Sequence, residues 1–280
     1  MILTDAHIHV QPWWELKPEM LAVMLRGRSD EAELQQIMKS PAQLLRKMDA
    51  EGIDRAVLVN YPSPDMLGFT HRVNDYVAEY CAAAPDRLVA MGGVHPRFAE
   101  DAAAEVRRAA ELGVKALKLH PPHMAVEPNA YLHGLDSLRA LYEEAQRLRL
   151  PVMIHTGTSI FPGARSRLGE PMAVDDVAVD FPDLKIIIAH GGRPLWMDQA
   201  FFLLRRFPNV SMDVSSIPPK AVLRYFPRLL EVADQVLYGS DWPGPGTPSM
   251  GANMREFRAL DLPAAVFEKI LDLNPRRIFG

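Results

Sequence analysis

Two histidines separated by one residue are the first side chains in this sequence that could do chemistry. His7 and His9 lie in the short apolar stretch Thr4–Val10. Because side chains alternate between the two faces of a β-strand, both imidazoles would point to one side of such a strand. Neutral imidazole is a good ligand for zinc and other first-row divalent metals. Two histidines at this spacing also occur by chance, so a metal site requires further ligands from elsewhere in the chain.

Further candidate ligands stand at the ends of later apolar runs. His155 and His190 each end such a run, Asp241 closely follows one, and Lys118 and His120 end another. Counting the first pair, five of the nine histidines lie at or near the ends of predicted strands. A random distribution seldom produces such a pattern, so the elements that carry these residues need to be identified.

Those elements alternate regularly along the chain. Short, continuously apolar runs are typical of buried parallel strands. Counting the first stretch, the sequence predicts eight strands, at residues 4–10, 56–60, 88–94, 114–120, 151–155, 185–190, 210–214 and 236–239. Helices are predicted between and after them, at about residues 41–51, 70–84, 99–112, 135–148, 174–181, 195–207, 219–232, 254–260 and 263–271.

Eight strands in uniform alternation with helices predict an α/β protein that forms a closed (β/α)8 TIM barrel. An open, doubly wound parallel sheet is the structural alternative, because a sequence does not reveal whether a sheet closes. No composition break or low-complexity linker interrupts the sequence, so we expect one domain over residues 1–280. An irregular excursion over residues 11–30 carries Trp13 and Trp14, which either pack locally or form one wall of a pocket.

In a closed barrel the candidate ligands would converge. The active site of such a barrel lies at the carboxyl ends of its strands. The eighth strand lies beside the first, so Asp241 would become a neighbour of His7 and His9, and His155 would face them across the mouth. Together they would give a divalent metal three nitrogens and one oxygen, with a position open for water or substrate. We expect one zinc ion, with manganese as the alternative.

Several of these stretches resemble the amidohydrolase superfamily, and most closely its amidohydrolase-2 branch. This branch contains metal-dependent hydrolases, lactonases and non-oxidative decarboxylases of the aminocarboxymuconate-semialdehyde and resorcylate type. The matching motifs extend from the first predicted strand to the last, so the resemblance covers essentially the whole chain. They are Asp5-Ala6-His7-Ile8-His9, Gly113-Val114-Lys115-Ala116-Leu117-Lys118-Leu119-His120-Pro121, Ile154-His155-Thr156-Gly157, Ala189-His190-Gly191-Gly192 and Tyr238-Gly239-Ser240-Asp241-Trp242-Pro243.

The resemblance implies roles for five of these residues. His7, His9, His155 and Asp241 would be the metal ligands, and His190 would orient or deprotonate the water on the metal. His190 and Asp241 are therefore the predicted catalytic residues. None of the motifs identifies a substrate.

Predicted substrate contacts are Lys118, His120, Arg193, Trp13 and Trp242. In two-metal relatives a lysine at the end of the fourth strand is carboxylated and bridges the ions, whereas the neighbouring His120 and the likeness to this branch favour one metal. Lys118 would then pair with a substrate anion or a nearby carboxylate. Arg193 follows the sixth strand, and guanidinium groups bind carboxylates through paired hydrogen bonds. Trp13 and Trp242 would supply apolar walls for a small organic acid.

The leading functional expectation is a metal-dependent hydrolase. A water activated by the metal would attack the C–O or C–N bond of a small, carboxylate-bearing lactone, ester or amide, while His190 or Asp241 moves the proton. The alternative is a non-oxidative decarboxylase, a carbon–carbon lyase that releases carbon dioxide from an unsaturated or aromatic acid. A binding protein with a structural metal is disfavoured, because structural zinc sites are usually closed by four closely spaced ligands.

The composition argues against some classes of binding partner. A net charge of -4 and a pI near 6.1 provide no basic field for nucleic acid or anionic lipid. The single cysteine, Cys81, fits a reducing compartment. With no secretion signal or long apolar segment in view, we expect a cytoplasmic protein that binds a small molecule and neither nucleic acid nor membrane. Homo-oligomerisation is a family-level expectation, and His123 is expected to be structural or solvent-facing.

Overall fold

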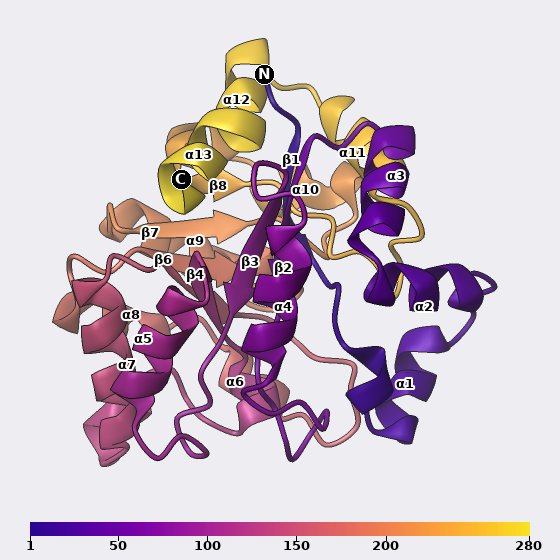
Figure 1. Cartoon of the computed structure of the whole chain (residues 1–280). Helices are drawn as coiled ribbons and strands as arrows, with labels where there is room; N and C mark the ends of the chain where they lie inside the picture. Colours follow the sequence, from indigo (N-terminus) through magenta and orange to yellow (C-terminus); the bar gives the residue numbers. More distant parts are fainter.

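Eight parallel strands form the centre of the computed structural model, which describes residues 1–280 (Figure 1). Each strand pairs with the next strand in sequence, so the order along the sheet runs from β1 to β8 without a reversal. The strands are β1 (Thr4–Ile8), β2 (Arg55–Val59), β3 (Leu88–Gly92), β4 (Ala116–Leu119), β5 (Val152–His155), β6 (Ile186–Ala189), β7 (Val210–Asp213) and β8 (Val236–Leu237).

Backbone hydrogen bonds join the last strand to the first. Ala6 N donates to Tyr238 O at 2.9 Å, and Asp241 N donates to His7 O at 2.8 Å. This seam closes the sheet into a barrel. The predicted (β/α)8 fold is therefore confirmed, and the doubly wound alternative, in which the strand order reverses, is excluded.

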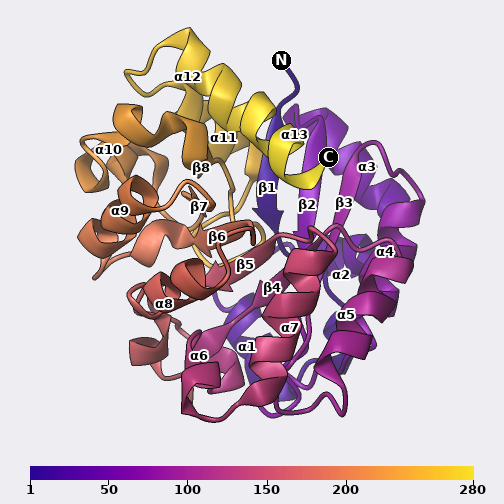
Figure 2. The same ribbon diagram turned by 90° about the vertical axis from the view of Figure 1, so that its left-hand side faces the viewer.

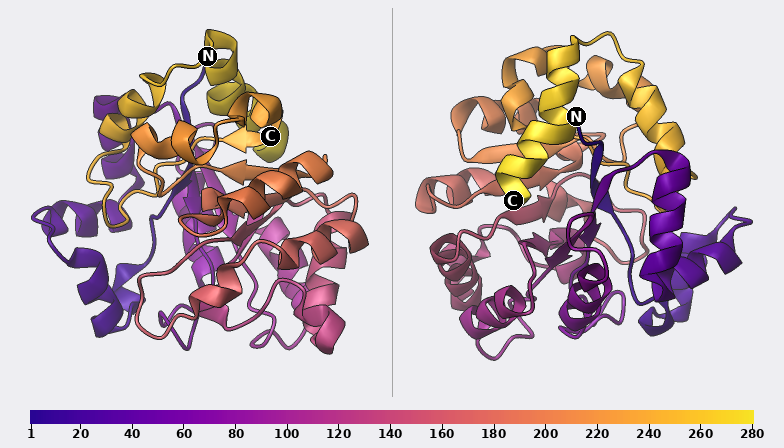
Figure 3. Two further views of the ribbon diagram at one scale, coloured as in Figure 1. Left: turned by 180° about the vertical axis from the view of Figure 1, so that it is seen from behind. Right: turned by 45° about the horizontal axis from the view of Figure 1, so that its top comes forward.

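An outer layer of helices surrounds the barrel (Figure 3). As predicted, α3 begins at Pro41 and ends at Gly52, whose left-handed φ of 74° suits a residue without a Cβ. No helix combines the length and the apolar character needed to cross a membrane. The helices are α1 (Pro18–Leu25), α2 (Glu31–Lys39), α3 (Pro41–Glu51), α4 (Val73–Ala82), α5 (Ala102–Glu111), α6 (Pro121–Met124), α7 (Asp136–Arg147), α8 (Ala173–Asp180), α9 (Met197–Arg206), α10 (Val222–Tyr225), α11 (Met250–Arg258), α12 (Ala264–Glu268) and α13 (Asn274–Phe279).

Two of the predicted segments were wrong. Residues 11–30 were expected to be irregular, yet they contain α1, which begins with a proline at its first position, where the missing N–H costs nothing. The helix expected over residues 219–232 is broken into short pieces. Pro227 follows α10 directly after Phe226, and proline disfavours helical backbone in the residue before it.

The apolar core has two layers. Along β2, Ala56 and Leu58 belong to the large cluster that contains the buried faces of the helices, whereas Val57 and Val59 belong to a smaller cluster inside the barrel. The end of α13 also belongs to this inner cluster, so that helix covers the amino end of the barrel. Figure 2 places α13 beside the N-terminus and α1 and α6 at the opposite end. That opposite end, where the strands finish, carries the candidate site.

Candidate metal centre and pocket

The seam between β1 and β8 brings the first ligands together. His9 Nε2 lies 3.1 Å and His7 Nε2 lies 3.6 Å from Asp241 Oδ1. The two imidazole centroids are 5.1 Å apart, so both rings reach the same space. This approach requires Gly239, two residues after β8, because a Cβ there would lie 2.6 Å from the Cβ of His7.

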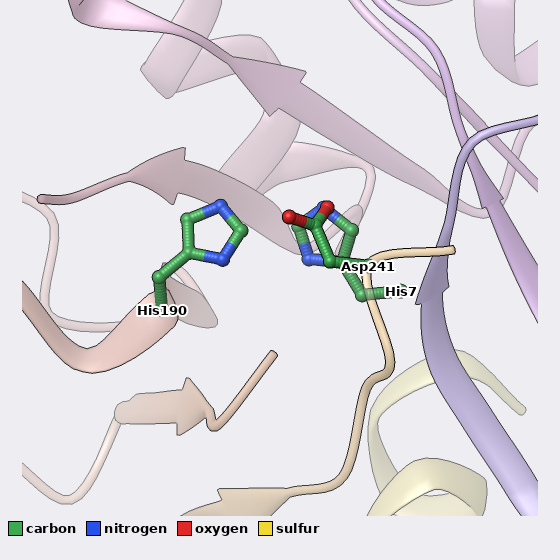
Figure 4. Close-up of side chains that lie close together, drawn as sticks. All are labelled: His7, His190 and Asp241. Atoms are coloured by element: carbon green, nitrogen blue, oxygen red, sulfur yellow. The ribbon is translucent and has the colours of Figure 1, made fainter. Parts of the chain in front are cut away.

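His190 joins this group from the end of β6. Potential ligand atoms of His7, His190 and Asp241 all lie within 4.8 Å of one another, and Figure 4 shows the His190 ring facing the other two side chains. His190 and Asp241 both have left-handed backbones, with φ of 65° and 64°. Such a conformation costs a non-glycine residue roughly 1 to 3 kcal/mol and is found mainly at functional sites.

His155, at the end of β5, lies on the far side of His190. Their ring centroids are 4.7 Å apart. Both ring nitrogens of His155 and the Nε2 of His7 are buried without a hydrogen-bond partner. Buried polar atoms are nearly always paired, so these nitrogens fit a ligand role. Nitrogen donors with one carboxylate suit a first-row divalent metal. That His155 binds the ion while His190 transfers a proton stays a prediction.

Burial sets the protonation state of His155 and His190. Burial lowers the pKa of His155 and of His190 well below the usual value. Both imidazoles are therefore neutral at physiological pH, and each keeps one nitrogen lone pair for a metal or a proton.

Asp213 and Ser215 orient these rings, and the sequence analysis missed both. Asp213 Oδ2 accepts a hydrogen bond from His7 Nδ1 at 2.8 Å, which directs Nε2 toward Asp241. His190 Nδ1 lies 2.8 Å from Ser215 Oγ and 3.2 Å from Ser215 O, so its Nε2 faces the ligand group. A carboxylate behind a ligating histidine is a common feature of metal sites. The available signal was the position of Asp213 at the end of an apolar run, as for His155 and His190.

A cavity of about 110 Å³ opens beside the ligands. Lys118 and Arg193 both line it, as expected. The Lys118 side chain is 1% exposed, its ammonium contacts only Met153 Sδ at 3.4 Å, and burial lowers its pKa to about 8. Arg193 donates to Thr158 O at 3.0 Å and Ser216 Oγ at 2.8 Å, while its buried Nε has no partner. Asp213 and Asp241 attract both cations but form no direct ion pair with either, so the cavity can accept an anionic ligand.

The predicted aromatic walls differ from the observed ones. His120 lines the cavity, and its ring stacks on His155 at 3.8 Å. Trp242 does not line it, because its fully buried ring lies 5.8 Å from the ammonium of Lys47 on α3. Trp13 packs in a separate cavity with α1 and α2. Neither of the two predicted tryptophans therefore lines the cavity beside the ligand group.

The sequence also matches a known protein family. A family model described as amidohydrolase matches residues 4–280, which is nearly the whole chain. The chain belongs to the amidohydrolase family. This membership confirms the resemblance seen in the motifs and makes the protein an enzyme of that family.

Characterised relatives of this amidohydrolase include decarboxylases. A gamma-resorcylate decarboxylase from Rhizobium sp. (strain MTP-10005) is 25% identical, over 84% of this chain and 85% of its own. Among solved structures, a TIM-barrel protein of unknown function from Bordetella bronchiseptica superposes with a TM-score of 0.79 at 22% identity, covering 99% of this chain and 98% of its own.

Two further structures contain metals. A 5-carboxyvanillate decarboxylase from Novosphingobium aromaticivorans, in complex with manganese, has a TM-score of 0.69 at 18% identity, covering 99% of this chain and 95% of its own. An amidohydrolase from Burkholderia multivorans, with bound zinc, has a TM-score of 0.69 at 14% identity and covers 100% and 99% of the two chains. Members of this fold thus bind either ion, and the ligand group of this amidohydrolase can hold a divalent metal.

Proposed function

We propose that this amidohydrolase is a divalent-metal-dependent, non-oxidative decarboxylase of a small aromatic or unsaturated carboxylic acid. The observation that carries the proposal is the pocket, where a metal-binding group adjoins two cations, Lys118 and Arg193, that have no carboxylate partner. The likeness to gamma-resorcylate decarboxylase favours this reaction over hydrolysis.

The size of the cavity supports a compact substrate. An apolar cavity of about 150 Å³ binds one benzene molecule, so the cavity of about 110 Å³ suits one ring or a shorter chain. Phe161 and Tyr61 supply apolar surface along its wall. A single-ring acid would fill this space with its carboxylate beside the cations.

Each residue has a distinct part in the proposed reaction. His7, His9, His155 and Asp241 would hold the ion, which when bound would polarise substrate oxygens as a Lewis acid. Lys118 and Arg193 would orient the carboxylate. The bond from the ring carbon to the carboxyl carbon breaks, its electron pair stays on the ring carbon, and carbon dioxide leaves. A proton delivered through His190 or Asp241 then replaces the carboxylate on that carbon.

Hydrolysis of a lactone, ester or amide is the second candidate, and one observation favours it. Ser215 occupies Nδ1 of His190, so the opposite nitrogen faces the ligand group with its lone pair free. A neutral imidazole in that position can accept a proton from an attacking water and return it to a leaving group. The same histidine would then act first as a base and afterwards as an acid.

The products distinguish the two candidates. Purified protein would be incubated with a panel of unsaturated and aromatic acids, lactones, esters and amides, before and after chelation and after addition of manganese or zinc. Chelator-sensitive release of carbon dioxide with one solvent deuterium incorporated into the product supports decarboxylation. Incorporation of solvent ¹⁸O without carbon dioxide refutes it and establishes hydrolysis.

A further inference from the structure

Three side chains at the pocket wall form a hydrogen-bonded chain that the proposed reaction does not use. Tyr61 Oη lies 2.9 Å from His123 Nδ1, and His123 Nε2 lies 2.8 Å from Ser159 Oγ. Tyr61 follows β2, His123 lies in α6 after β4, and Ser159 follows β5. All three line the same cavity as the metal-binding group. His123 is thus a buried residue of the pocket wall, so the solvent-facing alternative for it was wrong.

The position of His123 is tightly fixed. Its ring stacks on His120 at 3.5 Å, with 15° between the ring planes, and His120 stacks in turn on His155 at 3.8 Å. Phe161 packs edge-on against His123 at 5.1 Å. The hydroxyl of Ser63 donates to the backbone carbonyl of His123 at 3.1 Å. The three hydrogen-bonded side chains are therefore held in place, and only the His120 ring separates His123 from His155.

The position of the proton on His123 determines which hydrogen bonds the three side chains can offer to a ligand. The His123 imidazole is buried and neutral, so it has one N–H and one lone pair. If Nδ1 carries the proton, it donates to Tyr61, Ser159 donates to Nε2, and the Tyr61 O–H is free. In the other tautomer Nε2 donates to Ser159 Oγ and the Tyr61 O–H donates to Nδ1, so the Ser159 O–H is free and Tyr61 Oη can accept from a ligand. Either way, the two hydroxyls present one donor and one acceptor to the pocket.

We propose that Tyr61, His123 and Ser159 form a subsite that binds a hydroxyl group on the substrate ring, away from the reacting carboxylate. This inference rests on the proposed function, because the pose places the carboxylate beside the metal group and the cations. A hydroxyl both donates and accepts, so it satisfies the subsite in either tautomer. A ring without it would leave one hydroxyl proton and one acceptor of the subsite without a partner from the ligand. The substrate is accordingly a hydroxylated ring acid.

Ligand affinity tests the subsite without relying on turnover. Isothermal titration calorimetry on the metal-loaded protein would compare benzoate with 3-hydroxybenzoate and 4-hydroxybenzoate. At least one hydroxybenzoate should bind about 10-fold more tightly than benzoate, since one hydrogen-bonded group is typically worth up to about tenfold. In a Tyr61→Phe, Ser159→Ala double variant the preference should fall below about twofold. The affinity for benzoate should change little.

Controls separate this subsite from general damage and from the proposed reaction. Tyr131→Phe removes a hydroxyl that bonds Asp180 at 2.8 Å in the outer layer, and it should keep the preference. Equal binding of the three acids by the wild type, a preference that survives in the double variant, or no binding at all would each overturn the inference. Carbon dioxide release is scored separately, so a preference without decarboxylation would refute the reaction and leave the subsite standing.

Discussion

Replacing Asp213 by asparagine should weaken metal binding without removing any ligand. One carboxylate oxygen accepts from His7 Nδ1 at 2.8 Å, while the other accepts from His190 N and Ser215 N, each at 3.0 Å, and from the Ser215 hydroxyl. Asparagine has only one acceptor oxygen. The arrangement with the fewest clashes keeps that oxygen on the three donors and turns the amide NH₂ toward His7.

That arrangement changes the tautomer of His7. Its Nδ1 must now accept a hydrogen bond, so the proton moves to Nε2 and blocks the lone pair that faces Asp241. Loss of such an orienting partner typically costs 10- to 100-fold in metal affinity. This range corresponds to about 1.4 to 2.8 kcal/mol. Although burial raises the pKa of Asp213, His7 outweighs it and keeps that pKa below the usual range, so the wild-type residue is a carboxylate.

The assay is a competition between the protein and a chromophoric chelator of known zinc affinity. Ser215→Ala perturbs the same network but leaves the carboxylate on His7, so its dissociation constant should stay within about threefold of the wild type. Asp180→Asn, in the outer layer, controls for the loss of a charge, and thermal unfolding of each metal-free variant controls for folding. If Asp213→Asn binds zinc as tightly as the wild type, the tautomer argument is wrong.

Three further predictions concern other residues of the site. His155→Ala should lose the metal whereas His190→Ala should keep about one ion per chain and lose turnover, and elemental analysis giving the reverse would exchange their roles. Lys118→Met should stabilise the metal-free protein by about 2 to 4 kcal/mol at pH 7. Burial lowers the pKa of Lys118 from the usual 10.5 to about 8 in the folded protein, so keeping its charge buried and unpaired costs about that much free energy. Both folded and unfolded chains bind this proton below pH 8, so the gain in melting temperature should shrink as the pH rises from 8 to 10.5, and a pH-independent gain would contradict it. Arg193→Lys should raise KM by about tenfold with little change in kcat. Arg167 pairs with Glu127 at the surface, so the control variant Arg167→Lys should leave KM unchanged. Equal kinetic constants for the two variants would argue against contact between Arg193 and the substrate.

The sequence predicts the barrel well because its signal is repeated. Eight apolar runs separated by helical patterns need only the rule that parallel strands are buried on both faces. The position of His155 or Asp241 at a strand end then follows without coordinates, since the carboxyl ends of barrel strands meet at one mouth. Closure brings His7 and Asp241 together although they lie at opposite ends of the sequence.

The directions in which individual side chains point, and the local backbone conformation, could not be predicted in this way. Trp242 adjoins Asp241 in sequence, yet its buried ring lies against Lys47 of α3, away from the cavity. Asp213 ends its strand like several other polar residues, and only the folded barrel shows that its carboxylate reaches His7. The left-handed backbones of His190 and Asp241 are not marked by glycine, and histidine and aspartate adopt other conformations far more often.

The seam between β1 and β8 determines when during synthesis and folding the ligand group can assemble. Besides the strand pairing, Ser240 N donates to Asp5 Oδ1 across 235 positions of sequence. Contacts over such a separation form late in folding, because the intervening loop must close first. A growing chain therefore displays His7 and His9 long before it possesses Asp241. An ion held by all of them adds its binding free energy to barrel closure, about 2.7 kcal/mol at a concentration 100 times Kd. Metal binding at this site would therefore distinguish finished chains from partial ones.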